Sequence, residues 1–252
     1  MLTSPTIEKL RELKLTGMLK ALEEQNASKS YNKLSFDERL GYLVDNEKLT
    51  RDNKKTASRI HKAKLKQQAC IEDIDIKPQR GLDRSMILSL AKCQWIKEHH
   101  DIIITGLTGV GKTYIACALA HRACLEGYKT MYKRLPRLIE ELSIARADGT
   151  YPKLLERISK LDLLVIDDWG LFKLESQQAR DFLEIVEDRY ELRSTIISSQ
   201  VPVKEWHQLI ENSTVADAIL DRLVHGTYRI QMKGESLRKN KIKTKDMKKE
   251  DE

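Results

Sequence analysis

Residues 106–113 read GLTGVGKT and match the pattern G-x-x-x-x-G-K-[ST] at every fixed position. The loop consists of Gly106, Leu107, Thr108, Gly109, Val110, Gly111, Lys112 and Thr113. Glycines in such a loop let the backbone approach phosphate oxygens, because a Cβ would obstruct that approach. Backbone N–H groups and the N-terminus of a following helix supply partial positive charge. The stretch therefore predicts a phosphate-binding loop.

The sequence on both sides of the loop fits this interpretation. Residues 102–104 are three isoleucines, typical of a buried strand, and residues 114–126 have the pattern of a helix. We expect the Lys112 ammonium to bind the terminal phosphates and the Thr113 hydroxyl to bind Mg²⁺. Tyr114, the first residue after the loop, is expected to contact the nucleotide. The predicted cofactors are ATP and Mg²⁺.

A second part of the site is predicted 55 residues after Lys112. Residues 161–168 read LDLLVIDD, an apolar run that ends in Asp167 and Asp168. Ligands of open α/β sheets bind at the carboxyl ends of the strands, so both carboxylates are expected beside the loop. We predict that Asp167 holds Mg²⁺ and that Asp168 orients or deprotonates the attacking water. A strand that merely ends in a solvated acidic turn is the alternative.

After residue 100, short β-branched runs alternate with helical patterns, which is typical of βαβ units. Strands are predicted at residues 101–105, 129–133, 161–167, 194–199 and 227–231. Helices are predicted at residues 112–126, 136–147, 176–193, 203–210 and 215–223. The fold class predicted from this pattern is α/β, a three-layer P-loop NTPase with a five-stranded parallel sheet.

The first part of the chain has helical patterns instead of strands. One helix is expected to start at Pro5, and Ser35 with Glu38 forms a capping box for another, which we expect to continue to Cys70. The sequence KPQRG at residues 77–81 marks a boundary. The predicted domains are a helical N-terminal domain at 1–76, an ATPase domain at 77–232 and a basic C-terminal tail at 233–252.

Charge is unevenly distributed over the 252 residues. The net charge is +6 for residues 1–100, −2 for residues 101–232 and +3 for residues 233–252. No stretch approaches the ~18 consecutive apolar residues that a membrane span needs. The four cysteines have neither CxxC spacing nor the density of a disulfide scaffold. We therefore expect a cytoplasmic protein without membrane contact, whose basic ends bind a polyanion.

Six cations would lie within an arc of about 80° on one helix face. They are Lys48, Arg51, Lys55, Arg59, Lys62 and Lys66. Few aromatic residues lie among them, which argues against stacking on single-stranded bases. The cations predict phosphate contacts with duplex DNA, largely independent of its sequence. A solvated amphipathic face is the alternative interpretation.

Several segments, taken together in this order, resemble the IstB-like ATPases, transposition helper proteins of bacterial insertion sequences that are related to DnaC-type helicase loaders. The segments are GLTGVGKT at 106–113, LVIDDWG at 164–170, STIISSQ at 194–200, DRLVHG at 221–226 and GESLR at 234–238. The resemblance implies an AAA+ domain behind a small helical domain. It also implies a homo-oligomer that hydrolyses ATP, binds duplex DNA, and recruits or stimulates a transposase. Stimulation of a slow ATPase by DNA and oligomerisation is part of this expectation.

The same resemblance assigns roles to four further residues. Ser199 and Gln200 take the place of sensor I, which reads the γ-phosphate. Arg222 takes the place of an arginine finger that reaches the ATP of a neighbouring subunit, and Arg238 that of sensor II. Asp168 departs from the family pattern, because many AAA+ proteins have Glu there, and Gln200 stands where many relatives have Asn. The alternatives are a simple strand end, an ion pair between Arg222 and a neighbouring aspartate, and an ordinary tail charge.

Three other functions share these motifs. A helicase loader would bind a replicative helicase instead of a transposase. A small-molecule P-loop kinase would transfer phosphate to a metabolite without any effect of DNA. A nucleotide-gated scaffold would retain its activities after loss of the second carboxylate, Asp168.

Overall fold

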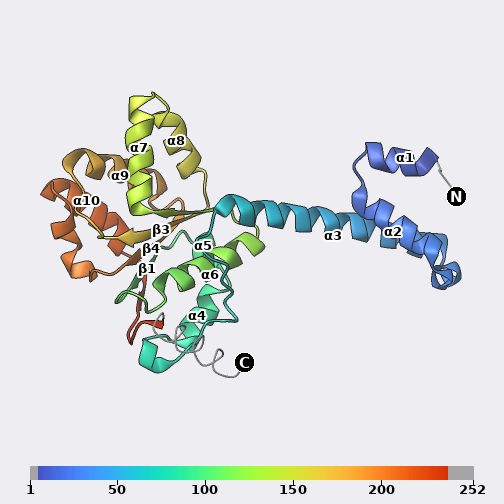
Figure 1. Ribbon diagram of the computed structural model, residues 1–252, viewed down its shortest axis with the longest axis horizontal. Helices are drawn as coiled ribbons and strands as arrows, with labels where there is room; N and C mark the ends of the chain where they lie inside the picture. Colours follow the sequence, from blue (N-terminus) through green and yellow to red (C-terminus); the bar gives the residue numbers. More distant parts are fainter. Residues whose placement is uncertain (1–4, 238–252) are drawn as a thin grey trace, which may run out of the picture. The chain divides into compact units, whose positions relative to one another are not determined.

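A parallel sheet with the strand order β2-β3-β4-β1-β5 forms the centre of the larger part of the chain (Figure 1). The computed structural model describes residues 5–237. The strands are β1 (Ile102–Thr105), β2 (Thr130–Arg134), β3 (Leu163–Trp169), β4 (Ser194–Ser199) and β5 (Tyr228–Gln231). Each strand begins within two residues of its predicted start, and the predicted fold class, a five-stranded parallel α/β sheet, is confirmed.

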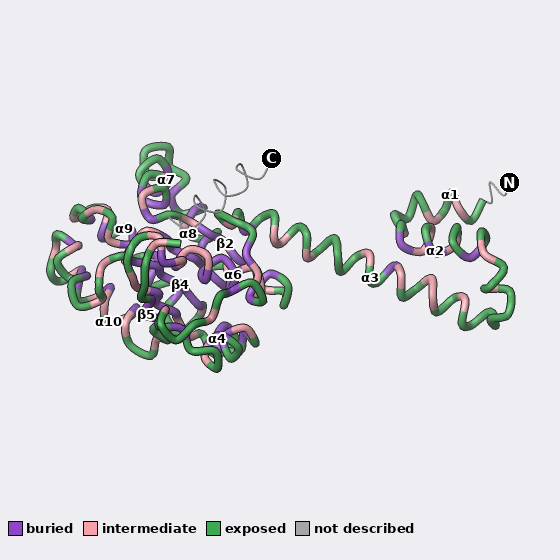
Figure 2. Tube along the Cα trace, turned by 60° about the horizontal axis from the view of Figure 1, so that its bottom comes forward, coloured by how far each residue is buried: buried purple, intermediate pink, exposed green. Residues whose placement is uncertain are grey.

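Helices cover both faces of the sheet, which explains why its central strands are continuous apolar runs. On one face α6 (Lys112–Leu125) and α4 (Arg84–Leu90) share a core with Ile102 and Ile104. On the other, Ile103 joins a second core. That core contains α7 (Leu135–Ala147), α8 (Tyr151–Ser159), α9 (Ser176–Arg189) and α10 (Ser213–Val224). Figure 2 shows the middle of the sheet and α6 as largely buried, and the residues of β1, β3 and β4 are mostly buried.

Some elements differ from the sequence prediction. The structure adds α8, α4 and the short α5 (Gln94–Lys97), and residues 203–210 form the 3-10 helix η3 (Val203–Leu209). The helix α9 ends at Arg189 and not at residue 193, because Glu191 has a φ of +55°. The Arg189 guanidinium is buried and donates hydrogen bonds to the carbonyl oxygens of Ile158, Leu161 and Ser194. Arg189 thus links α9 to residues 158–161 and to the start of β4.

The smaller unit, residues 1–58, is helical over its described part. It contains α1 (Pro5–Glu12), α2 (Thr16–Ala27), the 3-10 helix η1 (Lys29–Lys33) and most of α3 (Phe36–Ala63). The expected capping box is present, since Ser35 and Glu38 exchange backbone-to-side-chain hydrogen bonds. The single helix expected from Pro5 is broken at Lys14, whose φ is +57°.

Gly17 explains how α2 packs within this unit. A Cβ at Gly17 would lie 2.5 Å from the carbonyl oxygen of Asn46 on α3, so the two helices approach to backbone distance. The buried Glu47 carboxylate accepts hydrogen bonds from the N–H groups of Gly17 and Met18 at 2.7 and 3.1 Å. Glu47 thereby satisfies two backbone donors at the N-terminus of α2.

The predicted boundary at residue 76 differs from the division in the structure, which falls between Ser58 and Arg59, inside α3. The helix α3 ends at Ala63 and not at Cys70, because Lys64 has a φ of +49°. The apolar side chains after that point belong to the core of the larger unit, which explains the difference. They are Leu65, Ala69, Ile71 and Ile74.

No helix within residues 5–237 combines the length and apolar character needed to cross a bilayer. Most of the predicted tail at 233–252 lies outside the described residues.

Candidate nucleotide-binding site

The loop at residues 106–113 connects β1 to α6, as its sequence predicts. Gly106 has a φ of +151° and Gly111 a φ of +103°, backbone conformations that favour glycine. A Cβ at Gly106 would also lie 2.6 Å from the carbonyl oxygen of Met232. The Arg80 guanidinium supports the other side of the loop, because it donates a 2.7 Å hydrogen bond to the Val110 carbonyl oxygen. The chain therefore holds the loop in a fixed shape.

Lys112 lies at the start of α6 and is 8% exposed. Its ammonium donates hydrogen bonds to the carbonyl oxygens of Gly106 at 2.7 Å and Leu107 at 2.9 Å. The side chain thus folds back toward the loop, and its charge lies next to the first two residues of the loop. This is the position from which an ammonium can neutralise bound phosphates.

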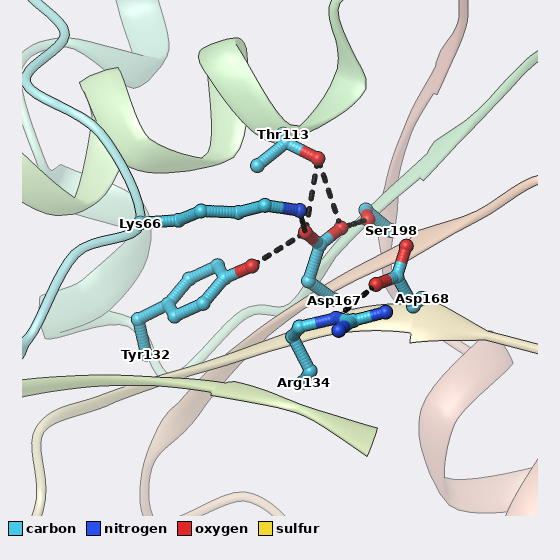
Figure 3. Close-up of polar contacts among 7 residues, drawn as sticks. All are labelled: Lys66, Thr113, Tyr132, Arg134, Asp167, Asp168 and Ser198. Atoms are coloured by element: carbon cyan, nitrogen blue, oxygen red, sulfur yellow. Dashed lines mark hydrogen bonds and ion pairs between the residues drawn. The ribbon is translucent and has the colours of Figure 1, made fainter. Parts of the chain in front are cut away.

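The Asp167 carboxylate contacts four other side chains of the site and is 1% exposed (Figure 3). The Thr113 hydroxyl donates to its two carboxylate oxygens at 2.9 and 3.2 Å, so the structure brings the two predicted motifs together. The Tyr132 hydroxyl donates to Oδ2 at 2.6 Å, and the Ser198 hydroxyl donates to Oδ1. The Lys66 ammonium lies 3.4 Å from Oδ2.

These contacts keep the Asp167 carboxylate ionised. Burial by itself raises the pKa of Asp167, but the hydrogen bonds from Ser198, Tyr132 and Thr113, together with the Lys66 charge, lower it further than burial raises it. The net result is a pKa below the ordinary value for aspartate. Burial and the neighbouring carboxylate both raise the pKa of Tyr132, which keeps its hydroxyl protonated as a donor.

Asp168 lines the same cavity although it follows Asp167 directly in a strand. Consecutive side chains of a regular strand point to opposite faces. Here the register of β3 and β4 shifts between Ile166 and Trp169, and Asp168 has a φ of +64°. Its carboxylate accepts a 2.5 Å hydrogen bond from Arg134 Nε, which raises the pKa of Arg134. The irregularity thus re-aims the second carboxylate toward the cavity.

The loop borders a cavity, and oxygen atoms of the kind that bind Mg²⁺ lie beside it. A cavity of about 420 Å³ lies between the loop and residues 66–80, and it is lined by Thr108, Lys112, Thr113, Tyr114, Asp168 and Gln200 among others. Mg²⁺ prefers hard oxygen ligands and retains several waters. One ionised carboxylate on Asp167 and one hydroxyl on Thr113, 2.9 Å apart, match that preference.

The model of the family described as "IstB-like ATP binding protein" matches residues 8–245. The chain belongs to the IstB-like ATP-binding protein family. The insertion sequence ATP-binding protein y4pL of Sinorhizobium fredii is 48% identical over 95% of this chain and 98% of its own length. An ATP-binding protein in an insertion sequence of Mycobacterium tuberculosis is 30% identical over 92% of this chain and 93% of its own length.

Solved structures share the fold of this IstB-like chain. The DnaC helicase loader superposes with a TM-score of 0.54 at 22% identity, over 66% of this chain and 97% of that one. A replication initiator DnaA, described as bound to AMPPCP and single-stranded DNA, gives a TM-score of 0.57 at 18% identity over 72% of this chain and 56% of that one. The larger part of the chain therefore shares its fold with these DnaC and DnaA structures.

The two residues predicted for sensor I have different surroundings in the IstB-like chain. The Ser199 hydroxyl is buried against backbone, donating to the carbonyl oxygen of Trp169 at 2.9 Å and accepting from Val201 N–H at 3.0 Å. Ser198 is the serine that contacts Asp167. Gln200 lines the cavity, where its Oε1 accepts a 2.5 Å hydrogen bond from the Thr108 hydroxyl.

Arg222 does not line the cavity of its own chain. On α10, it donates to the carbonyl oxygen of Ala218 at 2.8 Å and pairs with Glu187 on α9 at 3.0 Å. The ion-pair partner of Arg222 is thus Glu187 and neither of the aspartates near Arg222 in the sequence. Arg238 lies outside the described residues.

The predicted cation stripe is only partly a helix face. Lys66 was expected on it, but α3 ends at Ala63 and the Lys66 side chain reaches Asp167. The Arg59 Nε donates to the carbonyl oxygen of Cys124 at 2.9 Å. Two of the remaining cations form ion pairs within α3, Arg51 with Glu47 at 2.6 Å and Lys55 with Asp52 at 3.5 Å. Lys48 and Lys62 are exposed.

Sequence reasoning missed four residues of this site: Lys66, Tyr132, Arg134 and Ser198. For three of them a signal existed, because β2 and β4 are the sheet neighbours of β3 and parallel strands end at the same edge. The alternation of β4 places Ser198 with Ile196, which pairs with Val165, on the face of Asp167. Lys66 could not be placed in this way, because a helix was expected to continue through it and the turn at Lys64 was not predicted.

Proposed function

We propose that this IstB-like protein is an ATP-dependent, DNA-binding AAA+ ATPase that assists transposition. In this proposal it assembles as a homo-oligomer on duplex DNA in the cytoplasm and recruits or stimulates a transposase. The observation that carries the ATPase part is the contact of Thr113 with the ionised Asp167 beside the loop that holds Lys112. The insertion-sequence context of the relatives supports a transposase as partner.

In the proposed hydrolysis, different residues of the chain have different roles. Mg²⁺, when bound, neutralises charge on the phosphates. Thr113 and Asp167 hold that ion, and Lys112 neutralises the terminal phosphates. Asp168 is the residue in the cavity that accepts a hydrogen bond from the attacking water and fixes its direction. Arg134 holds the Asp168 carboxylate 2.5 Å from its Nε, so Asp168 must share or break this pair to act on water.

Duplex DNA is the proposed polyanion because exposed cations on α3, Lys48 and Lys62, are not accompanied by a row of aromatic residues. Such contacts are made to phosphates and depend steeply on salt. Arg222 is the proposed arginine finger, supplied to the ATP of the neighbouring protomer, and this makes assembly a condition for fast turnover.

The test measures ATP hydrolysis with Mg²⁺, with and without duplex DNA, for the wild type and for Lys112→Ala. We expect hydrolysis that duplex DNA stimulates in the wild type, and its loss in the variant. Undiminished hydrolysis in Lys112→Ala contradicts the site, and phosphate transfer to a metabolite without a DNA effect indicates a kinase. Co-purification with a transposase supports the proposed partner. Co-purification with a replicative helicase hexamer instead indicates a helicase loader, the alternative that the DnaC-like fold raises.

A further inference from the structure

Lys66 reaches the Asp167 carboxylate from a position that the larger unit fixes (Figure 3). The side chain comes from the segment that follows α3, and Cys117, which is buried on α6, belongs to the core on which this segment packs. Cys117 follows Thr113 by one turn of α6, so the helix that carries Thr113 also contributes to the core beside Lys66. The neighbouring Leu65 and Ala69 pack in the core. The packing of the chain on both sides of Lys66 therefore holds this residue close to Asp167.

The contact brings positive charge to a carboxylate that is 1% exposed. The three hydroxyl donors on Asp167, from Thr113, Tyr132 and Ser198, stabilise the ionised form but carry no charge themselves. A buried anion is costly without a nearby cation. Lys66 supplies one at 3.4 Å, while its own side chain remains 41% exposed.

We propose that Lys66 is a positioning residue that stands in for the metal ion at Asp167 and releases this carboxylate when nucleotide binds with Mg²⁺. This inference rests on the Mg²⁺–ATP site proposed above. The ammonium and the metal compete because both bring positive charge to the same carboxylate, which is shared with the Thr113 hydroxyl. The half-exposed, flexible stem of Lys66 lets the ammonium withdraw into solvent while the packing of Leu65 and Ala69 keeps the backbone in place.

The competition is tested with Lys66→Met, which keeps an unbranched apolar stem and removes the charge. The measurement is equilibrium binding of a fluorescent, non-hydrolysable ATP analogue as Mg²⁺ is titrated. We expect the Mg²⁺ concentration for half-maximal binding to fall about fivefold, the scale of a partly exposed ion pair. At saturating Mg²⁺ the nucleotide affinity should stay close to that of the wild type. Lys97→Met, exposed at the end of α5, is the matched control and should show no change.

A second variant tests the same competition in the opposite direction. Lys66→Arg keeps the charge and can bind the carboxylate with two N–H groups, so it should raise the Mg²⁺ requirement. An unchanged or raised requirement in a folded Lys66→Met protein overturns the inference, as does an Arg variant with a lowered one. Weaker binding of Lys66→Met at saturating Mg²⁺ also overturns it, because Lys66 is then a phosphate ligand. A wild type that binds no Mg²⁺–nucleotide overturns the proposed function as well.

Discussion

The Tyr132 hydroxyl donates a 2.6 Å hydrogen bond to Asp167 Oδ2, from β2 to the neighbouring β3. Both groups are buried, and the hydroxyl is part of the set of donors that lowers the pKa of the carboxylate. The ordinary aspartate pKa is about 3.9. Because the folded-state pKa lies below the unfolded-state one, the donors contribute stability at neutral pH that is lost as pH falls below about 4.

Tyr132→Phe removes only the hydroxyl. We expect the pKa of Asp167 to rise, so the acid limb of the pH–rate profile for ATP hydrolysis should move to higher pH. The free energy of unfolding should fall by about 1 kcal/mol, the scale of one hydrogen bond. Tyr190→Phe, on the exposed end of α9, is the control and should leave both quantities unchanged. An identical pH profile in Tyr132→Phe contradicts the role of the hydroxyl.

Ser198→Ala and Ser199→Ala form a matched pair of neighbouring substitutions. Ser198 contacts Asp167, so its variant should raise the Mg²⁺ concentration needed for half-maximal hydrolysis. The Ser199 hydroxyl hydrogen-bonds to backbone groups of Trp169 and Val201, so its variant should lower the melting temperature and leave that Mg²⁺ requirement unaltered. The reverse pattern, with the metal effect in Ser199→Ala, would restore Ser199 as sensor I.

Asp168→Asn keeps the size of the side chain and removes its charge. We expect nucleotide affinity to change less than about threefold, because Lys112, Thr113 and Asp167 are untouched, while hydrolysis falls by about 100-fold or more. Nucleotide binding and single-turnover hydrolysis measured on the same preparation separate the two effects. Full hydrolysis in this variant would indicate that another group orients the water and would favour the scaffold interpretation.

Gly17→Ala should destabilise the helical unit selectively. A Cβ at this position meets the Asn46 carbonyl oxygen at 2.5 Å, whereas one at Gly41 meets no atom within 4 Å. Gly41→Ala, within α3, should therefore increase stability by about 0.5–1 kcal/mol, while Gly17→Ala should decrease it by about 1–3 kcal/mol. Hydrogen exchange resolved by residue would locate the loss in residues 5–58. Equal effects of both variants would contradict the close packing of α2.

The central strands, the phosphate loop and its meeting with Asp167 could be predicted because they depend on short patterns and on one rule about parallel strands. The helix α8 also had a signal, since Tyr151, Leu154 and Ile158 recur at helical spacing and are buried. The end of α3 could not be found in this way. It depends on the backbone conformation of Lys64 and on the packing of Leu65 and Ala69 against residues that come much later in the sequence. The difference between Ser198 and Ser199 required the strand register.

The sheet order has a consequence for biosynthesis. Both neighbours of β1, the strands β4 and β5, are translated about 90 residues or more after it, and Gly106 N–H donates to the Ser199 carbonyl oxygen. A nascent chain that has not yet exposed β4 on the ribosome lacks the Ser199 carbonyl oxygen that supports the start of the loop. Late, long-range pairing of this kind makes folding slow and leaves apolar segments open to chaperones. The loop therefore gains this support only after β4 has been translated.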